Sequence, residues 1–126
     1  ALYHRCQRDP QAADAVARVA KAHGIGLLGQ PGFELLRAAG RAGIPAYREG
    51  FADRKLLPDG RLAPRDQPGA MLDAVRAGEQ AVRLARSGEV DSICVHGDTK
   101  GASRIAAAVR QALREAGIET GPLVLK

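Results

Sequence analysis

Helical and strand-like patterns alternate along this chain, and the alternation restricts its fold more than any other feature of the sequence. Apolar residues recur at helical spacing in the segments 10–23, 32–40, 74–87 and 102–116. Short apolar segments bounded by turn-forming residues lie between them, at 25–29, 45–51 and 90–95. Strands that alternate with helices form right-handed crossovers and a parallel sheet. We therefore predict an α/β fold with parallel strands.

The predicted helices have identifiable ends and core-facing sides. Asp9 is a candidate N-cap, Pro10 occupies the first helical position, and Gly24 and Gly88 follow the last turns of two helices. The segment 25–29 lies between glycines, which predicts a strand buried on both faces. Helical spacing selects the following side chains for the core: Ala12, Val16, Val19 and Ala20; Phe33, Leu36 and Ala39; Val75, Ala81, Val82 and Leu84; Ile105, Val109 and Leu113.

The length of the chain is typical of one domain, so we expect residues 1–126 to form a single domain. The predicted strands are few, even when a further candidate at residues 121–126 is included. They suffice for a small open sheet, or for about half of a barrel of roughly seven or eight parallel strands. We therefore expect a portion of a larger TIM-like (β/α) barrel.

Composition and charge argue against several classes of function. The net charge of +5 is compatible with nucleic-acid binding, but acidic residues are interspersed with the basic ones, and only two Tyr and two Phe are available for base stacking. No apolar run approaches the roughly 20 residues that span a bilayer. Cys6 and Cys94 fit neither a metal-ligand spacing nor a disulfide framework. We therefore expect a cytoplasmic protein without a nucleic-acid or membrane partner.

The tripeptide His96-Gly97-Asp98 follows the predicted strand at 90–95, at the end where parallel α/β folds place their reactive groups. A histidine side chain can hold a charge near neutrality, and Asp98 can orient His96, act as a base or bind a cation. The amides that begin the next helix add a candidate anion site. A second interpretation is purely structural: Asp98 or Thr99 caps the helix and His96 packs at the strand end.

A second candidate site lies at the end of the strand at 45–51. Glu49, Asp53 and Arg54 combine two carboxylates with a guanidinium, which suits proton transfer and the binding of a carboxylate or phosphate. A surface cluster of ion pairs is the alternative. A connection as long as residues 50–70 is usually functional when it occurs in a compact domain.

The long connection contains further signals. Asp59 and Gly60 predict a turn at the tip of a small hairpin. Arg65 and Gln67 are candidates to close over a substrate, and a rigid turn enforced by the neighbouring prolines and glycine is the alternative interpretation.

Taken together in order, these segments resemble a known family. EGFADRKLLPDGRLAPRDQPGA at 49–70 precedes ICVHGDTKGA at 93–102, and ALYHRCQRDP opens the chain. The ordered motifs closely resemble the LamB/YcsF family over essentially the whole chain. The amino-terminal motifs of that family have no counterpart here, and Thr99-Lys100 stands where Asn-Pro or Thr-Pro is expected.

The resemblance implies a distorted (β/α) barrel of about seven strands and a hydrolase. It also implies that the chain works with two partner subunits as a 5-oxoprolinase, which hydrolyses the cyclic amide of 5-oxo-L-proline to L-glutamate with ATP as cofactor. Magnesium is a further candidate cofactor, with Asp98 as its ligand. From residue chemistry, our hypothesis assigns catalytic roles to Glu49, Asp53, His96 and Asp98, and binding roles to Arg54, Arg65 and Gln67.

Two other functions remain open from the sequence. The first is a metal-dependent carbohydrate deacetylase-like barrel, to which His and Asp side chains would contribute ligands. The second is an inactive fragment whose open sheet edge recruits a partner, and which acts only as an interaction module. A bound metal would distinguish the first, and association without turnover the second.

Overall fold

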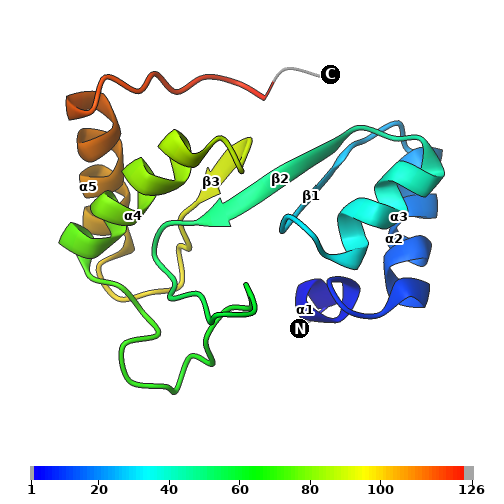
Figure 1. Ribbon diagram of the computed structural model, residues 1–126, viewed down its shortest axis with the longest axis horizontal. Coiled ribbons are helices and arrows are strands. Elements are labelled where there is room, and N and C mark those ends of the chain that lie inside the picture. Colours follow the sequence, from blue (N-terminus) through cyan, green and yellow to red (C-terminus); the bar gives the residue numbers. More distant parts are fainter. Residues whose placement is uncertain (1, 124–126) are drawn as a thin grey trace. The chain divides into compact units, whose positions relative to one another are not determined.

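The computed structural model describes residues 2–123 and confirms the α/β class (Figure 1). Its strands are hydrogen-bonded in the order β1-β2-β3. β1 and β2 are parallel, with Leu27 opposite Ala46 and Gly29 opposite Arg48. The elements follow one another as α1 (Leu2–Cys6), α2 (Pro10–Ala22), β1 (Leu27–Gly29), α3 (Glu34–Ala42), β2 (Ala46–Phe51), α4 (Ala74–Ser87), β3 (Ser92–Cys94) and α5 (Ala102–Glu115).

The described residues divide into two compact units. The first unit comprises residues 2–49, 89–92 and 122–123, and the second comprises residues 50–88 and 93–121. The strand predicted at 121–126 is not formed by residues 121–123, and the remainder of that prediction lies outside the described residues. No helix in the described part of the chain is both long and apolar enough to cross a membrane.

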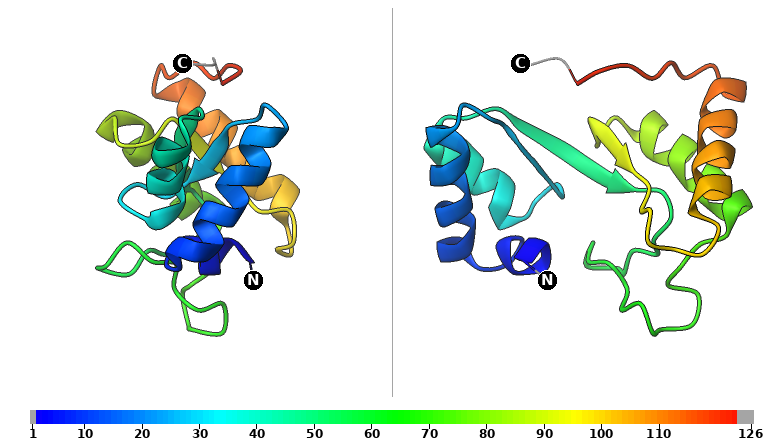
Figure 2. Two further views of the ribbon diagram at one scale, coloured as in Figure 1. Left: turned by 90° about the vertical axis from the view of Figure 1, so that its right-hand side faces the viewer. Right: turned by 180° about the vertical axis from the view of Figure 1, so that it is seen from behind.

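In the first unit, α2 and α3 lie side by side (Figure 2). Asp9 caps α2 as predicted, because its carboxylate accepts hydrogen bonds from the amides of Gln11 (3.0 Å) and Ala12 (3.2 Å). The core of this unit consists of small and branched apolar side chains from α1, α2 and α3: Cys6, Ala13, Ala17, Leu35 and Ala38.

Several predicted core positions in the first unit are wrong. Val19 is 59% exposed, because the face of α2 that packs on its neighbours is centred on Ala13 and Ala17. The strand predicted at 25–29 is not buried on both faces either, since Ile25 and Leu28 remain exposed.

In the second unit, α4 packs against α5. The α5 stripe was predicted correctly: Ile105, Val109 and Leu113 are all buried and contact the buried Ala77 and Ala81 of α4. The Val75 prediction was wrong, because the side chain is 71% exposed. Helical periodicity alone did not distinguish the Val75 side of α4 from the small-residue side that faces α5.

Gly78 brings the two helices together. A Cβ atom at this position would lie 3.1 Å from the Cβ of Ala112 and 3.5 Å from the carbonyl oxygen of Ala108. We expect Gly78→Val to lower the free energy of unfolding by about 1–3 kcal/mol, because the added methyl groups overpack the helix contact. Urea denaturation measures the loss. Glu79→Val, on the exposed side of the same turn, is the control and stays within about 0.5 kcal/mol of wild type; equal losses in both variants would contradict the packing argument.

The long connection between β2 and α4 is folded rather than structureless. The predicted hairpin is confirmed: the Leu57 amide donates to the Arg61 carbonyl (2.8 Å), and Leu56 pairs antiparallel with Leu62. A second antiparallel bridge joins Arg54 to Met71. The connection therefore returns alongside the residues that follow β2, which fixes the backbone around Asp53.

Candidate functional site

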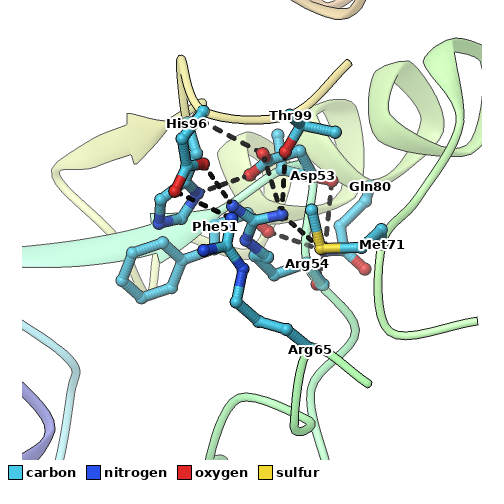
Figure 3. Close-up of polar contacts among 10 residues, drawn as sticks. Phe51, Asp53, Arg54, Arg65, Met71, Gln80, His96 and Thr99 are labelled. Carbon is cyan, nitrogen blue, oxygen red and sulfur yellow. Dashed lines mark hydrogen bonds and ion pairs between the residues drawn. The ribbon is translucent and has the colours of Figure 1, made fainter. Parts of the chain in front are cut away.

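A polar cluster in the second unit joins the end of β2 to the segment after β3, and Figure 3 shows its members. Asp53 follows β2 and is 1% exposed. Its carboxylate lies 2.9 Å from His96 Nδ1 and accepts a hydrogen bond from the His96 backbone amide (3.1 Å). Two contacts from one residue to one carboxylate fix both the position and the rotation of the imidazole.

The environment of His96 leaves one ring nitrogen available for proton transfer. A carboxylate beside Nδ1 favours the tautomer in which Nδ1 carries the proton, so Nε2 presents a lone pair. The ring stacks on Phe51, with centroids 5.5 Å apart, and its side chain is 29% exposed. Within the described residues, Nε2 has no hydrogen-bond partner. This arrangement suits a general base or acid whose orientation is set by a buried carboxylate.

Arg54 lies next to Asp53 and is 5% exposed. Its Nη2 donates to Asp98 Oδ1 (3.1 Å) and its Nη1 to Thr99 Oγ1 (3.1 Å). Nη1 also contacts the Met71 sulfur and lies 3.7 Å from Asp53 Oδ2. The guanidinium therefore compensates the buried negative charge of Asp53 and ties the two loop segments together.

Asp98 joins two arginines. Its Oδ1 accepts from Arg54, and its Oδ2 lies 2.7 Å from Arg65 Nη2. The Arg65 hydrogen bond, together with the positive charges of Arg65 and Arg54, lowers the pKa of Asp98 below its ordinary value of 3.8. Asp98 is therefore ionised at neutral pH, which suits a counter-ion rather than a proton donor. The capping interpretation is wrong, because Gly101 is the N-cap of α5 and no side chain caps it.

The Asp98 contact predicts a pH effect at acid pH. When the pKa of a carboxyl group is lower in the folded protein than in the unfolded chain, the group stabilises the folded protein at pH values above the unfolded-state pKa. This contribution is lost as the pH falls through the folded-state pKa. We expect Arg65→Met to move the pKa of Asp98 back toward 3.8, because the largest cause of its depression is removed. Carboxyl NMR titration measures both proteins. An unchanged Asp98 pKa in the variant would show that Arg65 does not hold this carboxylate in solution.

The other two predicted residues make different contacts. Glu49 belongs to the first unit, where it accepts a hydrogen bond from the Tyr3 hydroxyl (3.0 Å). Gln67 lies in the second unit with an exposed side chain, and its backbone amide donates to the Pro64 carbonyl in a turn. The structure therefore brings together Asp53, Arg54, Arg65, His96 and Asp98 of the predicted set.

Gln80 on α4 is the cluster member that sequence analysis missed. Its side-chain amide contacts the backbone carbonyls that flank Asp53 (Figure 3). A glutamine in the middle of a helix belongs to no recognisable motif. Its side-chain amide here contacts backbone carbonyls, which every residue has. No local pattern could have identified it.

Asp98, the predicted magnesium ligand, is occupied by other partners in this structure. Both Asp98 oxygens are engaged by guanidinium groups. Within residues 2–123, no three His, Cys, Asp or Glu side chains gather into a group that could hold a metal ion. Arg65, 61% exposed, is the accessible guanidinium of the cluster and the candidate contact for an anion.

Comparisons with known proteins agree with the motifs. The model of the LamB/YcsF family matches residues 1–125. A protein of Streptomyces griseus, named as the A subunit of 5-oxoprolinase, is 47% identical over 94% of this chain and 54% of its own length. A protein of the same name from Thermus thermophilus is 37% identical with the same coverage.

A solved structure supports the fold. The crystal structure of a lactam utilization protein from Thermus thermophilus superposes with a TM-score of 0.85 at 34% identity, and covers 94% of this chain and 53% of that one. The chain therefore spans about half the length of the relatives it matches.

Proposed function

The chain belongs to the LamB/YcsF family, and we propose that it is part of the A subunit of a 5-oxoprolinase, which hydrolyses the lactam of 5-oxo-L-proline to L-glutamate with ATP. Relatives named for that subunit and a structural neighbour named for lactam utilization support this proposal. We further propose that the chain forms the carboxyl-terminal half of a barrel of about seven strands and works with two other subunits in the cytoplasm.

The observation that carries the proposal is the buried Asp53 carboxylate against Nδ1 of a partly exposed His96. In our mechanism, Nε2 of His96 takes a proton from water as the water oxygen bonds to the lactam carbonyl carbon. The carbon–nitrogen bond then breaks, and the imidazolium returns the proton to the departing ring nitrogen. Asp53 holds the tautomer and stabilises the imidazolium.

Arg65 is our candidate for the substrate carboxylate. Its Nη2 pairs with one oxygen of Asp98 in the structure, and a substrate carboxylate is an acceptor of the same kind. ATP would supply activation of the stable amide. One accessible guanidinium and no glycine-rich phosphate loop are too little to hold a triphosphate, so no step through ATP is assigned to these residues.

The two alternative functions are not favoured. The relatives reported above are named for 5-oxoproline or lactam chemistry, and nothing in those names concerns deacetylation of a carbohydrate. In the proposed mechanism the Asp53–His96 pair transfers the proton during hydrolysis, whereas a protein that only binds a partner does not require such a pair.

The test is reconstitution. The protein that contains this chain, at the length of its relatives, is mixed with its two candidate partner subunits, 5-oxo-L-proline, ATP and magnesium, and glutamate is measured over time. We expect glutamate to form and its formation to stop without ATP. The corresponding Streptomyces griseus proteins serve as the positive control. Absence of glutamate beside an active control would overturn the proposal, and so would release of acetate from an acetylated sugar.

A further inference from the structure

One side chain contacts several backbone carbonyls at the end of β2. The Asp53 carbonyl accepts a hydrogen bond from the Leu72 amide (3.1 Å), where the segment after β2 pairs with the segment before α4. The carbonyls of Phe51 (2.6 Å), Ala52 (3.3 Å) and Arg54 (2.7 Å) all lie within hydrogen-bond distance of Gln80 Nε2. Buried carbonyls are almost always paired, because an unpaired one loses its hydration without compensation. The two N–H groups of one glutamine amide are therefore shared among the three carbonyls that surround Asp53.

The orientation of the Gln80 amide is also determined. Arg83, three residues later on α4, donates from Nη2 to Gln80 Oε1 (3.1 Å). An amide turned by 180° would place its oxygen against the carbonyls and its nitrogen against the guanidinium, so both contacts would become repulsive. Arg83 therefore favours the orientation in which the amide hydrogens face the end of β2.

We propose that Gln80 is a positioning residue that sets the Asp53–His96 geometry through the backbone of residues 51–54. This inference rests on the proposed function for its catalytic meaning. Two members of the site depend on the held segment directly: Asp53 presents the carboxylate, and Phe51 provides the surface on which the imidazole stacks. Gln80 contacts no reacting atom, and it acts by holding both of these residues from α4.

The kinetic consequence is a change in kcat with little change in KM. Misplacement of a catalytic pair by about 1 Å reduces turnover as much as about 100-fold, while a binding group elsewhere is unaffected. We expect Gln80→Met to lower kcat for glutamate formation about 10- to 100-fold and to leave KM within about twofold. Gln111→Met is the matched control, because Gln111 on α5 is exposed and its amide donates to Glu115 on the same helix.

A second readout does not require turnover. Nitrogen-15 NMR of the imidazoles reports which ring nitrogen carries the proton, and His4 and His23 provide internal references in the same chain. In wild type we expect the Nδ1-protonated tautomer at His96, and in Gln80→Met a mixture of both tautomers, because Asp53 is no longer held against Nδ1. Gln111→Met keeps the wild-type spectrum.

These measurements separate the two proposals. Wild-type nitrogen shifts at His96 in a folded Gln80→Met protein would overturn the positioning role, whether or not glutamate forms. A shifted tautomer in the variant, beside a wild-type system that forms no glutamate, would overturn only the proposed reaction. If Gln80→Met does not fold, Gln80→Asn decides the matter: it keeps the amide but withdraws it by about 1.5 Å, the length of one carbon–carbon bond. A wild-type tautomer in Gln80→Asn would count against the proposal in the same way.

Discussion

Asp53→Asn is expected to lower the rate of glutamate formation about 10²- to 10⁴-fold in the reconstituted system. The asparagine side chain has nearly the same shape, but it carries no charge to stabilise the imidazolium and no longer selects one tautomer of His96. One of its two polar atoms is an amide nitrogen, which opposes either His96 Nδ1–H or the His96 backbone amide. We expect KM to change little, because Asp53 is 1% exposed and contacts His96 rather than substrate.

The control for this result is Asp66→Asn. Asp66 lies on the same long connection with an exposed side chain, so its substitution removes one negative charge without touching the cluster. We expect its activity to stay at the wild-type level. Thermal unfolding of both variants verifies that they are folded. Wild-type turnover in a folded Asp53→Asn protein would remove the Asp53–His96 pair from the reaction.

Arg54→Met is expected to lower the free energy of unfolding by about 3 kcal/mol. Removing one partner of a buried ion pair leaves the other charge without compensation, and that penalty exceeds the value of most surface pairs. Asp53 is the charge left behind, and the Thr99 hydroxyl loses its donor. Arg54→Lys keeps the charge but loses the planar fork, so we expect a smaller loss.

Arg110→Met is the matched control, because Arg110 is an exposed arginine on α5. We expect it to change stability by no more than about 0.5 kcal/mol. Urea denaturation of all three variants in parallel gives the comparison. A loss in Arg54→Met no larger than that in Arg110→Met would show that the buried guanidinium is not needed to compensate Asp53.

The location of the site could be predicted from the sequence, whereas the pairing of its charged side chains could not. Asp53, Arg54, His96 and Asp98 were predicted to follow two strands, where the reactive groups of parallel α/β folds collect. The sequence suggested Asp98 as a carboxylate that could orient His96, whereas the structure pairs the two carboxylates differently. Asp98, two residues from His96, pairs with the arginines, and Asp53, separated from His96 by 43 residues, pairs with the imidazole.

Local sequence was enough to predict the order of helices and strands from α2 to α5, the Asp9 cap, the hairpin at Asp59-Gly60 and the buried stripe of α5, but not the short helix α1. Each of these depends on contacts between residues a few positions apart, and local spacing records such contacts. Three other features emerged only from the folded chain: Gly78 faces α5, Asp53 orients His96, and Gln80 holds the backbone around Asp53. These contacts join distant segments, and their partners are fixed by the path of the connection after β2 and by helix packing, which no local pattern encodes.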